Sequence, residues 1–319
     1  MELRNLGSSD IKIAPILMGT WQAGKTMWTG IDDAETQKAI RAAYDAGINA
    51  FDTAEVYGNG HSERILGKAL SDIRDKVVLA TKVFSNHLKY KQVINACERS
   101  LRNLKTDYID LYQIHWPAGS FGHVAVSIEE TMKAFVDLIK QGKIRAIGVS
   151  NFNRQQLDAA AQCALIASLQ SPYSLFWRHV EKDAATYCRD NNLGILAYSP
   201  LAQGLLTGKF GPNHRFEKGD HRSSNRLFNP PLSEHVQAAL ERLKPIAAAK
   251  GITLGQLALA WVISQPNTCA IAGARNQMQA IQNAAAAQVR LSPEELQILN
   301  DISDSVIAHA DDNPVLWKW

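Results

Sequence analysis

The stretch Gly47-Ile-Asn-Ala-Phe-Asp-Thr-Ala-Glu-Val-Tyr57 joins a short apolar run, residues 48–51, directly to the polar side chains of Asp52 and Tyr57. A brief and nearly continuous apolar run is typical of a strand that a parallel sheet buries on both faces. Seven similar runs occupy residues 16–18, 77–80, 110–114, 146–149, 167–170, 194–197 and 269–272. Eight strands that alternate with helices predict an α/β fold and favour a closed (β/α)8 TIM barrel, although the count alone also fits a doubly wound open sheet.

Helical patterns fill the gaps between these runs, for example at residues 33–46, 91–104, 128–141, 154–163 and 180–191. Two other segments break the alternation. Residues 2–13 alternate around Gly7-Ser-Ser-Asp10 like a β-hairpin, which we expect to plug the bottom of the barrel. Residues 201–231 form a long loop, rich in Gly, Pro and Asn, after the seventh strand. Long loops of this kind usually cover or bind a ligand, so we expect a lid here.

The composition is that of an ordinary globular protein, with 46% hydrophobic and 20% charged residues, and we interpret residues 1–319 as one domain. Lys and Arg are scattered and the net charge is only +3, so no nucleic-acid partner is expected. No apolar run approaches the roughly 20 residues that cross a bilayer, and the four cysteines form no metal pattern. The sequence therefore predicts a cytoplasmic protein without a membrane segment or metal, and leaves the oligomeric state open.

Polar residues directly follow several of the predicted strands, at the end of a barrel where active sites lie. Asp52 and Tyr57 follow the second strand, Lys82 the third and His115 the fourth. We expect Lys82 to lower the pKa of the Tyr57 phenol, Asp52 to keep Lys82 charged, and His115 to bind a carbonyl oxygen. Each residue alone also has a structural explanation, such as a cap or a surface cation. Together, four ionisable groups would be costly to bury unless they served one another or a ligand.

Four segments resemble those of the aldo-keto reductases: residues 47–58, Ala80-Thr-Lys82, Asp107-Tyr-Ile-Asp-Leu-Tyr-Gln-Ile-His115-Trp-Pro117 and Ile147-Gly-Val-Ser-Asn-Phe152. The loop from Tyr198 to Lys209 is similar to the branch that contains bacterial reductases and potassium-channel β subunits. The likeness extends from the hairpin to the last helix. It implies reduction of carbonyl groups by a nicotinamide hydride, with Tyr57 as the proton donor and Asp52, Lys82 and His115 completing a catalytic tetrad.

The resemblance also implies a set of residues that bind the cofactor. Ser150, Asn151 and Gln170 would hold the carboxamide, Tyr198 would stack on the nicotinamide, and the long loop would clasp the pyrophosphate. The full implied set is Gly19, Thr20, Trp21, Asp52, Ser150, Asn151, Gln170, Tyr198, Ser199, Pro200, Leu201, Gln203, Gly204, Leu205, Lys209, Arg222, Gly273, Arg275, Gln279, Gln282 and Asn283. No Gly-x-Gly-x-x-Gly motif follows an early strand, so the barrel itself would bind the dinucleotide.

The choice between NADPH and NADH depends on groups that could bind a 2′-phosphate. Gly273, Ala274 and Gln279 stand where the better-known animal reductases have Lys-Ser and Arg, so two phosphate contacts of those proteins are missing. Arg275 would compensate, because a guanidinium can bind a phosphate through two hydrogen bonds. A surface Arg at a helix start is the alternative interpretation. With Lys209 and Arg222 nearby, we expect NADPH rather than NADH.

The substrate pocket is expected to have aromatic walls. Its predicted residues are Trp21, Trp28, Tyr57, Phe84, His115 and Trp116, around a small-molecule carbonyl substrate that is not strongly anionic. For Trp28 and Phe84 a structural role fits almost equally well, as it does for Trp317 and Trp319 in the C-terminal tail. Two other functions remain open: a barrel lyase that forms a Schiff base on Lys82, and a regulatory NADPH sensor like the channel β subunits.

Overall fold

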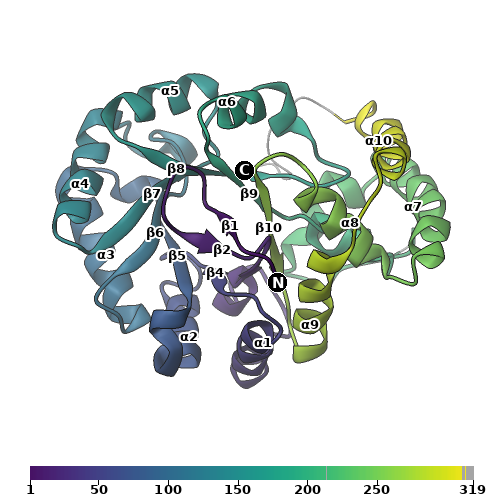
Figure 1. The fold of residues 1–319 in the computed structure, drawn as a ribbon, viewed down its shortest axis with the longest axis horizontal. Coiled ribbons are helices and arrows are strands. Elements are labelled where there is room, and N and C mark those ends of the chain that lie inside the picture. Colours follow the sequence, from purple (N-terminus) through teal and green to yellow (C-terminus); the bar gives the residue numbers. More distant parts are fainter. Residues whose placement is uncertain (213, 311–312, 314–319) are drawn as a thin grey trace.

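Eight parallel strands close into a barrel in the order β10-β3-β4-β5-β6-β7-β8-β9. The computed structural model describes residues 1–212, 214–310 and 313. Figure 1 shows the strands at the centre of a ring of helices. The barrel strands are β3 (Ile16–Gly19), β4 (Ala50–Asp52), β5 (Val78–Val83), β6 (Ile109–Ile114), β7 (Ile144–Ser150), β8 (Ile166–Pro172), β9 (Gly194–Tyr198) and β10 (Thr268–Gly273). All eight predicted strands, and the closed barrel that they favoured, are confirmed.

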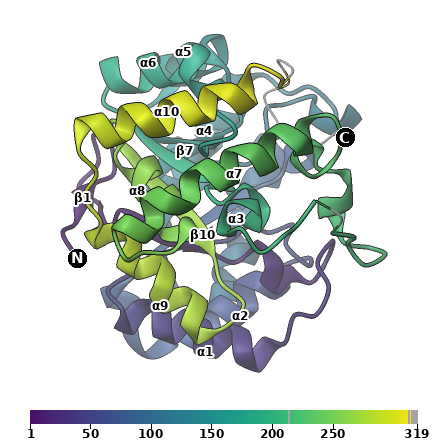
Figure 2. The ribbon, with the colours of Figure 1, turned by 90° about the vertical axis from the view of Figure 1, so that its right-hand side faces the viewer.

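The helices cover the outside of the barrel and most begin at a capping side chain. Asp32, Ser127, Asn153 and Thr253 each accept a hydrogen bond from the backbone N–H of the third residue that follows. The helices are α1 (Asp33–Asp45), α2 (His61–Leu70), α3 (Tyr90–Leu104), α4 (Ile128–Lys140), α5 (Arg154–Cys163), α6 (Ala184–Asp190), α7 (Leu232–Ala249), α8 (Leu254–Ile263), α9 (Gln277–Ala285) and α10 (Pro293–Ile307). Figure 2 shows α7 and α10 packed beside each other on the outer face.

The prediction of a single helix at residues 180–191 is wrong. Two helices occupy this range, η5 (His179–Lys182) and α6, and they are separated at Asp183, whose φ of −134° is not helical. The carboxylate of Asp183 accepts a hydrogen bond from the backbone N–H of Arg154 at 3.0 Å, at the start of α5. The break in the helix is therefore accompanied by a contact between distant segments. A local sequence pattern contains no information about such a contact.

The predicted hairpin is confirmed and closes the bottom of the barrel. It consists of β1 (Arg4–Asn5) and β2 (Lys12–Ile13), which pair antiparallel. Leu6, Ile11 and Ile13 are almost fully buried, in one cluster with the apolar side chains that point into the barrel. Gly7 lies so close to the barrel that a Cβ atom would be 2.2 Å from the carbonyl oxygen of Ala167, and its φ of +55° also favours glycine.

The described residues of the long loop after β9 contain three short 3₁₀ helices, η6 (Ala202–Thr207), η7 (His221–Ser224) and η8 (Arg226–Phe228). Gln203 adopts a left-handed conformation with a φ of +57°, next to Gly204 at +97°. Farther along the loop, the Nδ1 atom of His221 is 2.8 Å from the carbonyl oxygen of Met27, in the segment that follows β3. The loop thus reaches across the open end of the barrel and meets a segment from the other end of the sequence.

In the part of the chain that the structure describes, no single helix is long and apolar enough to cross a membrane; α7 and α8 pass that test only as a pair bent by 89°. No group of three or more His, Cys, Asp or Glu side chains that could hold a metal ion occurs among the described residues. Trp317 and Trp319, for which two roles were open, lie outside these residues.

Candidate active site

A cavity of about 560 Å³ opens at the carboxyl ends of the barrel strands. Of the residues predicted for cofactor and substrate, all line it except Leu205, whose side chain belongs to the hydrophobic core. Lys82, the remaining member of the tetrad, is fully buried beneath the cavity. The cavity has ten further lining residues that the sequence did not suggest: Gln22, Met27, Val56, Thr207, Thr253, Gly255, Gln256, Ile271, Ala272 and Ala274.

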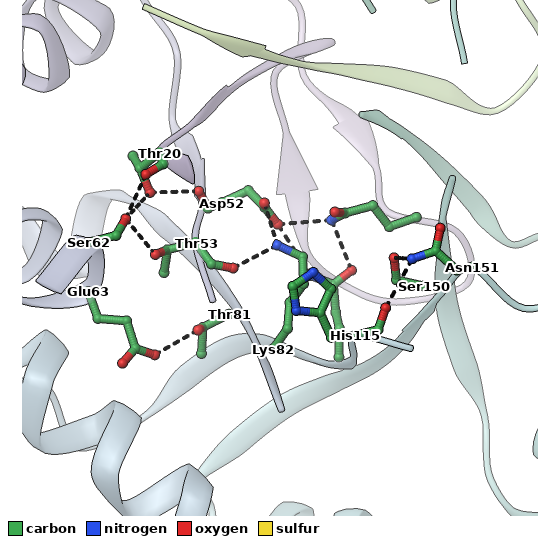
Figure 3. Close-up of polar contacts among 12 residues, drawn as sticks. Thr20, Asp52, Thr53, Ser62, Glu63, Thr81, Lys82, His115, Ser150 and Asn151 are labelled. Carbon is green, nitrogen blue, oxygen red and sulfur yellow. Dashed lines mark hydrogen bonds and ion pairs between the residues drawn. The ribbon is translucent and has the colours of Figure 1, made fainter. Parts of the chain in front are cut away.

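An ion pair between Lys82 and Asp52 lies at the floor of this cavity (Figure 3). The Nζ atom of Lys82 is 2.6 Å from Oδ1 of Asp52 and also donates to the carbonyl oxygen of Thr53 at 2.7 Å. The other carboxylate oxygen of Asp52 accepts hydrogen bonds from the side-chain amides of Gln170 at 2.9 Å and Gln113 at 3.3 Å. Because both oxygens are engaged, the carboxylate is held firmly and can in turn hold Lys82.

Tyr57 lies in the turn between β4 and α2, where glycines allow a close approach of two backbone segments. A Cβ atom on Gly24 would be only 2.6 Å from the carbonyl carbon of Tyr57. The ring of Tyr57 is centred 5.1 Å from Nζ of Lys82 and 5.7 Å from the ring of His115, which it meets edge to face. The structure therefore brings the four predicted tetrad residues together.

The pKa of the Tyr57 phenol is shifted in the direction opposite to the one that we expected from Lys82. Burial, followed by the negative charge of Asp52 and the nearby Tyr198, raises the pKa of the Tyr57 phenol well above its ordinary value of 10.0. The prediction of a lowered pKa is therefore wrong, because desolvation and the charge of Asp52 both raise the pKa of the phenol. Tyr57 thus keeps its proton at neutral pH and can donate it.

His115 and Lys82 are also shifted by burial. Desolvation first, and then the charge of Lys82, lower the pKa of His115 well below its ordinary value of 6.5, so its imidazole is neutral at neutral pH. Its Nδ1 atom is buried and has no hydrogen-bond partner among the described residues. Desolvation lowers the pKa of Lys82, whereas its interactions with Asp52 oppose that shift. The predicted contribution of Asp52 to keeping Lys82 charged therefore agrees with these shifts.

Gln170 and Ser150, beside the tetrad, present one hydrogen-bond acceptor and one donor to the cavity. The Nε2 atom of Gln170 donates to Asp52 and lies 3.3 Å from Oε1 of Gln113, so its own Oε1 remains for a ligand. The amide nitrogen of Asn151 donates to the carbonyl oxygen of His115 and to Oγ of Ser150, which leaves the Ser150 hydroxyl hydrogen available. One acceptor beside one donor is the complement of a primary carboxamide.

Three cations line the other end of the cavity. Arg222 forms an ion pair with Asp220, whereas Lys209 and Arg275 have no such carboxylate partner among the described residues. Burial, followed by the charges of Arg222 and Arg275, lowers the pKa of Lys209. The Nη2 atom of Arg275 is buried without a hydrogen-bond partner in the described part of the chain. Lys209 and Arg275, which repel each other and lack a carboxylate partner among the described residues, are suited to binding an anion such as a phosphate.

The aromatic wall extends farther than expected. Phe84 and Trp116 line the cavity on the side of His115, with the Phe84 ring 5.5 Å from the His115 ring. Trp28 contacts Trp21 edge to face at 5.4 Å, and its ring also lies 5.1 Å from the guanidinium of Arg222. Trp28 therefore connects the predicted substrate wall with the cationic end of the cavity.

Two buried glutamines belong to the site although the sequence analysis did not identify them. Gln22 donates to the carbonyl oxygens of Gly19 and Ala274, and so joins the ends of β3 and β10. Gln113 lies two residues before His115 on β6 and contacts Asp52. Side chains two apart on a strand point to the same face, so the position of His115 was a signal that could have identified Gln113.

Comparison with known proteins is consistent with this geometry. The model of the aldo/keto reductase family matches residues 15–304. Aldo-keto reductase YhdN of Bacillus subtilis is 37% identical, over 97% of this chain and 95% of its own. A probable voltage-gated potassium channel β subunit of Oryza sativa is 32% identical, over 96% of this chain and 97% of its own.

Solved structures give the same result. The glycerol dehydrogenase of Gluconobacter oxydans has a TM-score of 0.88 at 35% identity, covering 99% of this chain and 98% of its own. An aldo-keto reductase of Klebsiella pneumoniae in complex with NADPH has a TM-score of 0.77 at 31% identity, covering 100% of both chains. The predicted resemblance is therefore confirmed, and the chain belongs to the aldo/keto reductase family.

Proposed function

We propose that this protein reduces aldehydes and ketones to alcohols with NADPH, and that Tyr57 is the general acid. The observation that carries the proposal is the position of a protonated phenol at the floor of the cavity, between the Lys82–Asp52 ion pair and a neutral His115. These three surroundings supply what proton transfer to a carbonyl oxygen requires: a donor, a fixed positive charge and a hydrogen-bonding group.

The cavity fits NADPH at both ends. The acceptor of Gln170 and the hydroxyl of Ser150 match the carboxamide of nicotinamide. The Nη2 atom of Arg275, which has no hydrogen-bond partner among the described residues, and the desolvated ammonium of Lys209 match a 2′-phosphate, which NADH lacks. When bound, this cofactor would supply the hydride. The presence of NADPH in the related Klebsiella pneumoniae structure supports the same choice.

The chain's own residues then have separate tasks. Tyr57 donates its proton to the carbonyl oxygen, and the positive charge of Lys82 stabilises the phenolate that remains. Asp52 keeps Lys82 charged and in place through the 2.6 Å contact. His115, being neutral, can donate one N–H hydrogen bond to the same carbonyl oxygen and so orient the substrate.

Replacement of Tyr57 by Phe tests the proposal. We expect turnover with a panel of aldehydes, followed by NADPH oxidation, to fall by a factor of about 10² to 10⁴, the usual contribution of general acid catalysis. Tyr198→Phe is the matched control, because it removes a cavity hydroxyl that bonds Asn151 instead. It should weaken NADPH binding more than the chemical step. Wild-type turnover in Tyr57→Phe, with cofactor still bound, would exclude Tyr57 as the acid.

One alternative has a specific observation in its favour. The similarity to a plant potassium-channel β subunit is compatible with a regulatory protein that holds NADPH and turns over slowly. Rapid multiple turnover of a simple aldehyde would support the enzyme, and tight retention of cofactor with very slow oxidation would support the sensor. A Schiff-base lyase gains no support, because Lys82 is fully buried, does not line the cavity and is held by Asp52.

A further inference from the structure

Glu63 is a carboxylate in the protein core that the proposed reaction does not use. It lies in the first turn of α2 and its side chain is completely buried. One oxygen accepts a hydrogen bond from the hydroxyl of Thr81 at 2.8 Å and the other from the amide of Asn103 at 2.9 Å. Figure 3 shows Thr81, the neighbour of Lys82 on β5, between this carboxylate and the lysine. These two donors, and the Ser100 hydroxyl that also acts on the carboxylate, are neutral groups.

The other buried carboxylates among the described residues have a cation in direct contact. Asp52 contacts Lys82, while Asp110, Glu55 and Asp220 are each paired with an arginine. Glu63 forms no such ion pair among the described residues. A buried charge without a paired counter-ion is costly, and burial accordingly raises the pKa of Glu63. A carboxylate kept in such a place calls for an explanation beyond packing.

The charged and titratable groups around Glu63 show which of them it can serve. Lys82 on β5, Glu55 in the Tyr57 turn, Cys97 on α3 and Tyr112 on β6 all interact with it electrostatically. Of these four groups, Lys82 alone is a cation. Thr81 and Lys82 are consecutive on a strand, so their side chains point to opposite faces. Glu63 therefore lies outside the barrel wall, and Lys82 lies inside it.

We propose that Glu63 is a positioning residue of the catalytic centre: a second buried carboxylate that acts across β5, together with Asp52, to keep Lys82 protonated. The inference rests on the proposed function for its catalytic consequence, but not for its effect on Lys82. Hydrogen bonds from Thr81 and Asn103 fix the carboxylate without neutralising it, so its field remains available to the lysine.

The neighbouring side chain of Ser62 connects the same helix turn to the other strand ends. Its hydroxyl donates to the carbonyl oxygen of Thr20 at 2.8 Å and accepts from the hydroxyl of Thr53 at 2.9 Å. The carbonyl oxygen of Thr53 in turn accepts from Lys82. Two consecutive residues at the start of α2 thus act on the surroundings of Lys82. Ser62 holds the strand ends in place, and Glu63 supplies a negative charge.

The decisive measurement is the protonation of Lys82 itself, which needs neither cofactor nor turnover. We would titrate the side-chain NMR signal of Lys82, assigned with Lys82→Met, in the wild type, in Glu63→Gln and in Thr81→Val. Glu63→Gln removes the charge and keeps an acceptor for Thr81, whereas Thr81→Val removes the hydrogen bond and keeps the charge. We expect the titration of Lys82 to move down by about one pH unit in Glu63→Gln and to stay within about 0.3 unit in Thr81→Val.

The catalytic consequence is measured separately. In Glu63→Gln the alkaline decline of kcat/KM should begin at lower pH, because activity is lost when Lys82 loses its proton. A second variant, Glu63→Asp, retains the negative charge and should keep the wild-type pH profile. It provides the comparison if the Glu63→Gln variant folds poorly. An unchanged titration of Lys82 in Glu63→Gln overturns the inference and shows a purely structural role, for which only thermal stability would fall. A shifted titration without any effect on kcat/KM would instead refute the proposed role of Lys82 in catalysis.

Discussion

Replacing Asp52 by Asn would leave the ammonium group of Lys82 buried without its direct counter-ion. In the native structure the two groups are 2.6 Å apart, and their side chains are 0% and 4% exposed. The substitution also introduces a conflict of donors. One Asp52 oxygen faces Lys82 and the other faces the amides of Gln170 and Gln113, so the new NH₂ group must point at a donor in either orientation.

The expected loss of stability follows from this geometry. Removing one partner of a buried ion pair costs about 3–5 kcal/mol, because the other charge remains uncompensated. With an unfolding entropy of about 2.1 cal/mol/K per residue, a chain of 319 residues loses about 1.5 °C in Tm per kcal/mol. We therefore expect Asp52→Asn to lower Tm at neutral pH by about 4–8 °C. Part of the loss would be relieved if Lys82 gives up its proton.

A double-mutant cycle with Lys82→Met tests this explanation. Lys82→Met removes the cation, so adding Asp52→Asn to it should cost far less than Asp52→Asn alone, with a coupling of about 2 kcal/mol or more. The pH dependence has a defined sign. In the folded protein the pKa of Lys82 lies below 10.5, its value in the unfolded chain. Between the folded and the unfolded pKa the unfolded chain therefore binds more protons, and the stability of the fold rises with pH over this range. Asp52→Asn should extend the window to lower pH. Strictly additive losses in thermal or denaturant unfolding would refute the ion-pair argument.

Three other changes test separate parts of the site. Gly24→Ala would place a Cβ atom 2.6 Å from the backbone of Tyr57, so we expect kcat to fall at least tenfold while NADPH affinity, measured by fluorescence titration, changes little. Arg275→Ala should weaken NADPH binding by about tenfold to a hundredfold, the equivalent of a lost charged hydrogen bond, and leave NADH binding unchanged; equal effects on both cofactors would contradict a phosphate contact. His115 stays neutral because burial lowers its pKa, so kcat/KM should show no inflection at pH 6.5; an inflection that disappears in His115→Gln would show that it titrates there.

Much of the fold could be predicted because the barrel imposes a strong pattern on the sequence. A strand buried on both faces must be apolar throughout, which marks β4 and the other seven strands in a single sequence. The carboxyl ends of parallel strands meet at one edge, so Asp52, Lys82 and His115 could be placed together from chain order alone. The break at Asp183 could not be predicted, because its cause is a hydrogen bond to Arg154 on another element.

The sequence predicted which residues form the site better than it predicted their protonation states. The sequence shows that Tyr57 and Lys82 are neighbours, but not that both are desolvated or that Asp52 acts on the phenol as well as on the lysine. The direction of a pKa shift depends on burial and on several distances, which a linear pattern does not contain. Leu205 shows the same limitation, because its place in the predicted cofactor loop did not reveal that its side chain turns into the core.

The direction of the Tyr57 shift bears on which reaction the site favours. In the proposed mechanism, reduction of a carbonyl uses Tyr57 as a phenol, whereas the reverse oxidation of an alcohol would use the phenolate as a base. Desolvation, followed by the negative charge of Asp52 and by the nearby Tyr198, favours the phenol. A phenol that keeps its proton at neutral pH fits the proposed reduction. In the proposed reaction, Lys82 would stabilise the phenolate that forms after proton transfer, and Asp52 would hold the ammonium group in place.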